Sequence, residues 1–416
     1  MKRVILPTLT FCAITCLHLI SHGQDTSYQA SVGVRAGTQI DWVYVLANQS
    51  PKEPPAKWLQ GYDSTKQTYE RFVPRSYRKT QSYPLVLFVS PSAKAMGFRS
   101  WKRVCEARGI LFAGPHNAGN NRDTPQRVHI LLDVLDDMRR QYNIDPDRTY
   151  IAGFSGGGRI ACSIAFALPE YFGGVIPICA AGDLREESWL RQRVVDRLSV
   201  AHLTGETDFN HGEVERFRGP MLADVGVRSR VWVVPKMGHS MPRDDHLGEA
   251  FDWLEGGLQT RQTLAKKSPA SRVENRDTLT RDQLAKLWLD EGRARLNDVK
   301  TRYAGLMQLK GVLTRWPDLP QAASAKTVLL EYENSKDTTW ETEDVAEQRR
   351  FLIARARALD AYASGALPKQ YEAQRQDMAQ AAINLWTIVL NDGQDARAAA
   401  QAKERIPALK RLLEGE

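Results

Sequence analysis

The stretch Tyr150-Ile151-Ala152-Gly153-Phe154-Ser155-Gly156-Gly157-Gly158 decides the fold. It sets a G-x-S-x-G pattern between a short apolar run, typical of a strand, and Arg159 to Leu168, which has the length and composition of a helix. A serine on so sharp a strand-to-helix turn is strained, and flanking glycines keep Cβ atoms out of the neighbouring backbone. The pattern predicts a Ser155 hydroxyl raised above a sheet, beside a Gly156 N–H that faces any oxyanion formed there.

The same glycines also fit a nucleotide-binding loop, because residues 156–161 satisfy G-x-G-x-x-[GA]. That fingerprint requires an acidic residue about 20 positions further on, at the end of the next strand. Here the next expected strand ends in Cys179 and Ala180, and Asp183 follows only after a loop. The sequence therefore disfavours nucleotide binding.

Short apolar or β-branched runs alternate with helix-length amphipathic segments from Gln39 to about Trp253. This alternation predicts an α/β fold with a doubly wound, mostly parallel sheet and helices on both faces. The expected strands are Gln39–Leu46, Thr68–Val73, Leu85–Ser90, Ile110–Ala113, Tyr150–Gly153, Gly174–Cys179, Val200–Leu203 and Arg230–Val234. The expected helices are Ser100–Ala107, Gln126–Tyr142, Gly156–Leu168, Glu186–Leu198, Glu213–Ala223 and Asp245–Glu255.

A serine nucleophile needs a base, and the base needs an acid that orients it. His239 lies in the loop after the last expected strand, and Asp208 lies in the loop after the preceding one. The chain order Ser155, Asp208, His239, each at the carboxyl end of a strand, is that of an α/β-hydrolase triad. Weaker alternatives remain open: Glu206 and Asp183 for the acid, and His116 and His211 for the base.

Three further segments carry a family resemblance: Ile144-Asp145-Pro146-Asp147-Arg148, Pro169-Glu170-Tyr171-Phe172-Gly173-Gly174-Val175 and Gly238-His239-Ser240-Met241-Pro242. Together with the glycine-rich turn they resemble the secreted esterases grouped with polyhydroxybutyrate depolymerases and feruloyl esterases, over about residues 65 to 255. The resemblance implies an α/β-hydrolase with Ser155 as nucleophile, His239 as general base and then acid, and Asp208 holding the imidazole. It implies no metal and no cofactor, and the substrate would be a small or polymer-linked carboxylic ester.

One segment departs from that family. Many relatives have a His-Gly pair after the strand at Leu85–Val89, where this chain has Ser90-Pro91-Ser92-Ala93. Pro91 has no N–H, so the second oxyanion donor, beside Gly156, is expected from Ser92 or Ala93. A missing donor typically costs about 10²–10³ in turnover. A weak or inactive envelope binding protein that acts through its helical domain therefore stays open as an alternative. A serine peptidase on the same scaffold is another, because acyl transfer to water uses the same residues.

Residues 1–23 read as a leader that is removed on export. Lys2 and Arg3 form a positive start, Val4 to Ile20 is apolar, and small residues stand at Ser21 and Gly23. We expect a periplasmic or secreted protein without a membrane span, and an uncleaved anchor is the alternative. Three cysteines would remain, Cys105, Cys162 and Cys179, which allow at most one disulfide and are more simply small buried residues.

The last third of the chain is expected to be helical. After the domain at 24–262, residues 263–280 read as a polar linker, and Thr280 with Gln283 forms a capping box that opens the helical domain at 281–416. Val312-Leu313, Asp318 and Ala322-Ala323 recur 77 residues later as Val389-Leu390, Asp395 and Ala399-Ala400. This helix-turn-helix echo resembles tetratricopeptide-like repeats and suggests a surface for a protein partner, although a plain bundle fits as well.

The charge balance points away from nucleic acid. The formal net charge is +8, and the loss of Lys2 and Arg3 with the leader lowers it to +6. A basic excess of this size attracts polyanions only where it is concentrated, and the sequence holds no run of five or six like charges.

Overall fold

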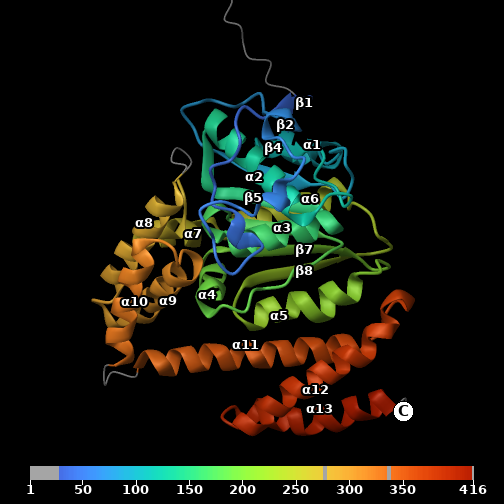
Figure 1. The fold of residues 1–416 in the computed structure, drawn as a ribbon. Helices are drawn as coiled ribbons and strands as arrows, with labels where there is room; N and C mark the ends of the chain where they lie inside the picture. Colours follow the sequence, from blue (N-terminus) through green and yellow to red (C-terminus); the bar gives the residue numbers. More distant parts are fainter. Residues whose placement is uncertain (1–27, 275–278, 335–338, 415–416) are drawn as a thin grey trace, which may run out of the picture.

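The computed structural model describes residues 28–274, 279–334 and 339–414 (Figure 1). The expected leader at 1–23 lies outside the described residues. A sheet of eight strands runs through the centre in the order β1-β2-β4-β3-β5-β6-β7-β8. The strands are β1 Gln29–Gly33, β2 Thr68–Phe72, β3 Tyr83–Val89, β4 Leu111–Pro115, β5 Ile144–Phe154, β6 Gly174–Ile178, β7 Ser199–Gly205 and β8 Arg228–Val234.

The sheet has an antiparallel edge and a parallel body. β1 pairs antiparallel with β2, and β2 pairs antiparallel with β4, whereas the strands from β4 to β8 in the sheet order all pair in parallel. Helices follow these strands and cover both faces. The predicted α/β-hydrolase fold, with its mostly parallel sheet, is confirmed.

The period of two along each strand divides the core into two layers. Leu85, Leu87 and Val89 of β3 join the core on one face, and Val86 and Phe88 join the core on the other. Helices α2 (Thr124–Gln141) and α3 (Gly156–Ala167) cover the first face, and helices α1 (Phe98–Arg108) and α6 (Asp244–Glu255) cover the second. Burial on both faces explains why β3 reads as a continuous apolar run.

One expected strand is wrong. Gln39–Leu46 forms no strand, and residues Val43–Val45 form a short 3-10 turn instead. The backbone N–H groups at the start of this segment are not free to pair with a strand. Those of Thr38 and Gln39 donate to the carboxylates of Asp133 and Asp136 on α2. The edge strand β1, which is almost wholly exposed, was not anticipated.

Helix α4 (Ser188–Arg197) agrees with the prediction, but the helix expected at Glu213–Ala223 is divided. Glu213–Arg218 winds as a π-helix, and α5 covers Gly219–Asp224. Pro220 follows the junction, and a proline cannot donate to the turn before it. Part of the segment expected as a linker is also helical, since α7 spans Leu258–Lys267 and a 3-10 turn spans Pro269–Ser271.

The predicted all-helical region follows, with α8 Arg281–Arg295, α9 Val299–Arg315, α10 Pro320–Glu333, α11 Thr339–Ser364, α12 Arg375–Asp392 and α13 Ala396–Glu414. The capping box at Thr280 and Gln283 is present. The two echoed segments are both a helix, a turn with Asp and a second helix, first α9 with α10 and then α12 with α13. The tetratricopeptide-like character of these helices stays a prediction.

The first helices of this region share a core with the sheet. Trp189 of α4 packs edge-on against Trp288 of α8, with ring centroids 5.9 Å apart, and Trp288 packs in the same way against Trp316. Helices α12 and α13 form a smaller core with one side of α11. In Figure 1, α11 runs beneath α5, with which it is in contact. The domain boundaries at 262 and 281 remain a prediction.

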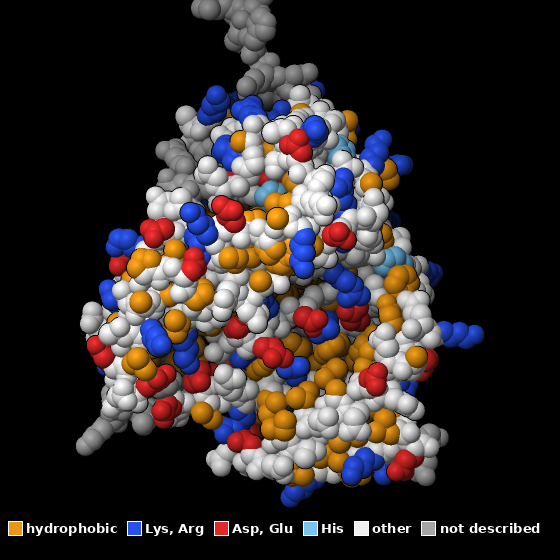
Figure 2. Space-filling model, viewed as in Figure 1, with side chains coloured by type: hydrophobic (Ala, Val, Ile, Leu, Met, Phe, Trp, Pro, Cys, Tyr) orange, Lys and Arg blue, Asp and Glu red, His pale blue; other side chains and the backbone are white. Residues whose placement is uncertain are grey.

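Basic and acidic side chains are interspersed over the face drawn in Figure 2. Cys105, Cys162 and Cys179 are free and buried. Within the described ranges, no helix is both long and apolar enough to cross a bilayer.

Candidate active site

Ser155 occupies the turn between β5 and α3 in a strained conformation. Its φ of +53° and ψ of −126° lie outside the regions that non-glycine residues ordinarily adopt. Two backbone hydrogen bonds fix the turn, from Ser155 N to Ile178 O at 2.8 Å and from Gly158 N to Ser155 O at 2.9 Å. The strain is thus held by the sheet on one side and by the first turn of α3 on the other.

Two glycines are required by close contacts around this turn. A Cβ at position 153 would lie 2.4 Å from the Gly157 carbonyl oxygen, and a Cβ at position 157 would lie 2.2 Å from the Val89 carbonyl oxygen. Both neighbours are backbone atoms of the central sheet and the turn, so they cannot move aside cheaply. The glycines therefore allow α3 to start directly against β3 and β5.

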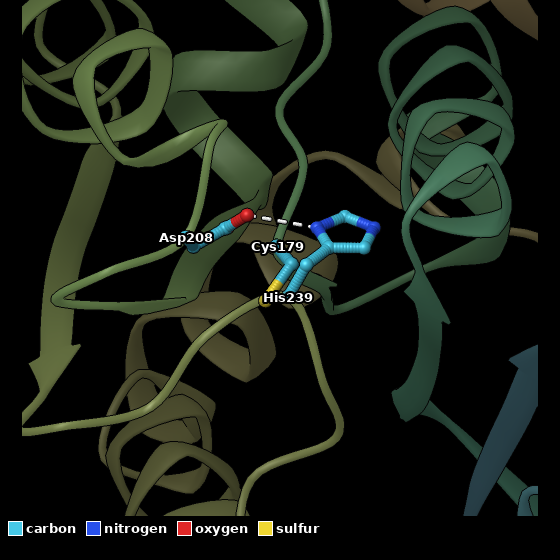
Figure 3. Close-up of side chains that lie close together, drawn as sticks. All are labelled: Cys179, Asp208 and His239. Carbon is cyan, nitrogen blue, oxygen red and sulfur yellow. Dashed lines mark hydrogen bonds and ion pairs between the residues drawn. The ribbon is translucent and has the colours of Figure 1, made fainter. Parts of the chain in front are cut away.

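The structure brings Ser155, His239 and Asp208 together from three loops. His239 Nε2 lies 2.9 Å from Ser155 Oγ, and His239 Nδ1 lies 2.8 Å from Asp208 Oδ1. The three residues follow β5, β8 and β7, so they meet at the carboxyl edge of the sheet. Figure 3 shows the Asp208 carboxylate directed at the imidazole. The chain from hydroxyl to imidazole to carboxylate is complete.

Asp208 is fixed by its own loop. Its Oδ2 accepts a hydrogen bond from Thr204 Oγ1 at 2.9 Å, and its Oδ1 accepts one from the Asn210 backbone N–H at 3.1 Å. The Asp208 side chain is fully buried. The carboxylate is therefore oriented toward His239 and satisfied on both oxygens.

The alternative residues have other partners. Asp183 is 72% exposed and pairs with Arg218, and Glu206 accepts the Lys236 N–H at 2.8 Å. His116 bridges Ala95 N and Ala30 O, and His211 contacts Glu215. Of the acids and bases considered in the sequence, the structure brings Asp208 and His239 to Ser155.

Cys179 lies beside Asp208 and His239, and the three side chains form a group whose ligand atoms lie within 4.8 Å of one another (Figure 3). Burial raises the pKa of the Cys179 thiol to about 12, and the neighbouring Asp208 charge raises it too. A metal would require the thiolate and the ring nitrogen that faces Asp208. Because both nitrogens of His239 already meet Asp208 and Ser155, and the Cys179 thiol contacts the Ser240 carbonyl, the group fits a hydrolytic triad better than a metal site.

Two aromatic side chains enclose the imidazole. The Phe209 ring stacks on His239 with centroids 4.0 Å apart, and the Phe154 ring lies 5.0 Å from it at a tilt of 40°. Phe209 remains 38% exposed. The ring of His239 is thus restricted to the plane in which its two nitrogens meet Ser155 and Asp208.

The Ser90–Ala93 loop lies beside the turn. The Ser92 N–H donates to Ser90 Oγ at 3.1 Å, which occupies one of the two N–H groups expected to face an oxyanion. The loop is held by the following one, because Asn117 N donates to Ala93 O at 2.5 Å and Asn120 N donates to Pro91 O at 2.8 Å. The loop that would offer a second oxyanion donor is therefore fixed by residues 117–120.

Sequence reasoning missed two residues on this side of the site. The Asn120 side chain lies against Gly156, since a Cβ at position 156 would lie 2.3 Å from Asn120 Oδ1 and 2.8 Å from Asn120 Nδ2. The buried Arg127 donates to Ala118 O at 2.8 Å and to Gly156 O at 3.2 Å, so it joins the Asn120 loop to the turn. Nothing local in the polar run around Asn120 indicates that it folds over Gly156.

Two more residues were missed on the other side. Asn210 is buried and donates from Nδ2 to Cys179 O at 2.8 Å, and its Oδ1 accepts a hydrogen bond from the Tyr371 hydroxyl at 3.1 Å. Tyr371 belongs to the helical region, 161 residues further along the chain. A contact of this sequence separation leaves no pattern that sequence reading detects.

No protein-family model matches the chain. The poly(3-hydroxybutyrate) depolymerase of Ralstonia pickettii is 30% identical over 102 residues, which cover 21% of this chain and 21% of that protein. The chain thus aligns with about a fifth of this relative's length.

Among solved structures, a thermostable esterase is similar at 23% identity and a TM-score of 0.36, covering 46% of this chain and 59% of that chain. Esterase PE8 is similar at 20% identity and a TM-score of 0.34, covering 43% and 95%. A ferulic acid esterase is similar at 14% identity and a TM-score of 0.35, covering 47% and 92%.

Proposed function

We propose that this protein is an exported serine hydrolase that cleaves carboxylic esters through an acyl-enzyme. The observation that carries the proposal is the continuous contact from Ser155 Oγ to His239 Nε2 and from His239 Nδ1 to Asp208, at 2.9 and 2.8 Å. A hydroxyl, an imidazole and a buried carboxylate in this order form the constellation that activates serine for acyl transfer.

In the first half-reaction, Ser155 Oγ bonds to the ester carbonyl carbon while His239 Nε2 takes the hydroxyl proton. The Asp208 carboxylate stabilises the imidazolium that forms. The carbon–oxygen bond to the alcohol then breaks, and His239 gives its proton to the departing alcohol. In the second half-reaction, water repeats these steps against the acyl group, so that the acid leaves and Ser155 recovers its proton.

The tetrahedral oxyanion would be held between the Gly156 N–H and a second donor. Ser92 and Ala93 were expected to supply that donor from the backbone. The Ser92 N–H is engaged by Ser90 Oγ, which favours Ala93. The Asn120 side chain lies against Gly156, and its Nδ2 would be a further donor on the same side.

The test is a comparison of Ser155→Ala with wild type, both starting at Gln24, on p-nitrophenyl acetate and with a fluorophosphonate probe. Ser155→Ala is expected to lose turnover and labelling. Ser163→Ala is a matched control, because Ser163 lies on α3 and donates to Arg159 O, away from the triad. Turnover and labelling that persist in Ser155→Ala would exclude Ser155 as the nucleophile.

A substrate panel distinguishes the chemistry of the acyl donor. Acetyl, butyryl, feruloyl and 3-hydroxybutyryl esters are compared with aminoacyl amides, and the esters are expected to react faster. The segment similar to a poly(3-hydroxybutyrate) depolymerase is the reason for including the hydroxybutyryl ester. Faster amide cleavage would favour a peptidase.

Sequencing of the N-terminus of protein recovered outside the cytoplasm tests export and cleavage after Gly23.

A further inference from the structure

We propose that the helical region holds the loop of the triad acid in its working position, with Tyr371 as a positioning residue. The inference rests on the proposed function of Ser155, Asp208 and His239. It assigns a structural role in catalysis to the last third of the chain. Its basis is the short connection from Tyr371 through Asn210 to Asp208.

The connection has one intermediate residue. Tyr371 lies in the short turn Lys369–Gln374 between α11 and α12, and its hydroxyl donates to Asn210 Oδ1 at 3.1 Å. The Asn210 backbone N–H donates to Asp208 Oδ1, the same oxygen that faces His239 Nδ1. A movement of Asn210 therefore changes the hydrogen bonding of the oxygen that stabilises the imidazolium.

Asn210 is buried, so its side-chain oxygen needs a donor from the protein, and the Tyr371 hydroxyl is that donor. Its side chain is 3% exposed, and its two polar atoms meet Cys179 O and the Tyr371 hydroxyl. A buried amide oxygen that loses its donor carries a desolvation penalty, and the loop relieves that penalty by moving or by admitting water. The Tyr371 hydroxyl thus fixes both the side chain and the backbone N–H of Asn210.

The helical region also contacts the segment Glu213–Arg218, which follows the acid loop directly. Arg216 donates to Ala366 O, and the Phe217 ring stacks on Tyr362 of α11 with centroids 5.6 Å apart. Arg216 and Phe217 belong to the π-helix that follows the acid loop, and π-helical turns occur often at functional sites. On the face drawn in Figure 2, hydrophobic side chains gather where the sheet part meets the last helices.

The turn that carries Tyr371 is also fixed from its own side. Arg375 donates to the carbonyls of Ala363 and Gly365 and pairs through two nitrogens with Glu372. Tyr371 is therefore presented to Asn210 by a segment tied to the ends of both α11 and α12. This is the arrangement expected of a support for the acid loop.

The decisive variant is Tyr371→Phe, which removes one hydroxyl and keeps the ring. The matched control is Tyr332→Phe on α10, a helix that contacts α8 and α9. The first readout is the NMR resonance of the His239 Nδ1–H proton, assigned with His239→Gln. The hydrogen bond to the Asp208 carboxylate moves this resonance downfield, so a loosened Asp208 should move it upfield in Tyr371→Phe.

The second readout is steady-state kinetics on p-nitrophenyl acetate. In Tyr371→Phe we expect kcat to fall about threefold to tenfold with KM nearly unchanged, because a small misplacement of the acid acts on the chemical step. Tyr332→Phe should match wild type in both readouts. In an Asn210→Ala background, Tyr371→Phe should have no further effect.

An unchanged His239 Nδ1–H resonance in folded Tyr371→Phe overturns the inference, and so does additivity with Asn210→Ala. These outcomes are separate from a failure of the proposed function. If wild type neither turns over esters nor reacts with the fluorophosphonate, the proposed function fails, and the His239 Nδ1–H resonance still decides whether Tyr371 acts on the triad loop.

Discussion

Arg315 and Glu170 form a fully buried ion pair across 145 residues, with Arg315 Nη1 2.7 Å from Glu170 Oε1. Glu170 lies between α3 and β6, and Arg315 ends α9, so the pair joins the part of the chain that holds the sheet to the helical region. Arg315 also donates to Asp41 O, and Trp316 Nε1 donates to Asp41 Oδ2 at 2.7 Å. Buried charges thus join the two parts of the chain, and removal of the charge on one side should lower the free energy of unfolding.

Arg315→Met should lower the free energy of unfolding by about 3–5 kcal/mol, because it removes the cation that Glu170 and Asp41 share and leaves Glu170 with Arg193 alone. The measurement is urea denaturation followed by fluorescence and circular dichroism. Arg349→Met is the matched control, since Arg349 pairs with Asp392 at the surface, and it should cause no measurable change. Equal stabilities of the two variants would contradict the role given to the buried pair.

The pH dependence of stability should report on Glu170. Burial raises the pKa of Glu170, but the charges of Arg193 and Arg315 together lower it by more. The pKa in the folded protein therefore lies below the ordinary value of 4.5. A carboxyl with a depressed pKa stabilises the fold above pH 4.5, and this contribution is lost as the pH falls through the folded pKa. Wild type should therefore lose stability below about pH 4.5 more steeply than Glu170→Gln. Parallel stability curves between pH 5 and 3 would contradict this.

Removal of the helical region should prevent folding of the rest. A chain that ends at Leu279 would expose Trp189 and leave Glu170 without Arg315. We expect such a fragment to be insoluble or to lack a cooperative unfolding transition, whereas the full chain should unfold in one transition that involves the sheet. A soluble fragment that unfolds cooperatively and reacts with the fluorophosphonate would instead support independent domains with a boundary near 263–280.

The identity of the acid can be decided by two matched amide substitutions. Asp208→Asn keeps the shape of the side chain but removes the charge opposite His239, and it should lower kcat about 10⁴-fold, as loss of the acid does in other triads. Asp183→Asn should leave kcat nearly unchanged, because Asp183 is mostly exposed and pairs with Arg218. The measurement is kcat on p-nitrophenyl acetate, with thermal unfolding as the check of folding. The reverse order of effects would assign the acid role to Asp183.

Local sterics and strand order account for what could be predicted from the sequence. The glycines at 153 and 157 mark a turn that other residues cannot form, and a residue that follows a parallel strand lies at the carboxyl edge of the sheet. These two rules suffice to bring Ser155, Asp208 and His239 together without knowledge of any contact. They do not depend on which loop packs against which.

Features that depend on distant partners could not be predicted. The alternation of Ile40, Trp42 and Tyr44 is typical of a strand, but carboxylates of α2 take the backbone N–H groups just before it. The polar composition of residues 258–267 gives no sign of α7. Arg261 of this helix is buried and donates hydrogen bonds to the Asp147 carbonyl and the Tyr150 hydroxyl. In each case tertiary contacts override the local pattern.

Asn120 can be tested as an oxyanion donor by Asn120→Ala and Asn120→Asp. The side chain is exposed and contacts Gly156, while its backbone N–H is held by Pro91 O, so the substitutions should leave the loop folded. Loss of one donor from such a site costs about 10²–10³ in kcat, and Asn120→Asp should be the worse of the two because a carboxylate repels the oxyanion. Asn121→Ala, one residue further along the same loop, is the control and should retain wild-type kcat. If Asn120→Ala also keeps kcat within twofold, the second donor is the backbone of Ser92 or Ala93.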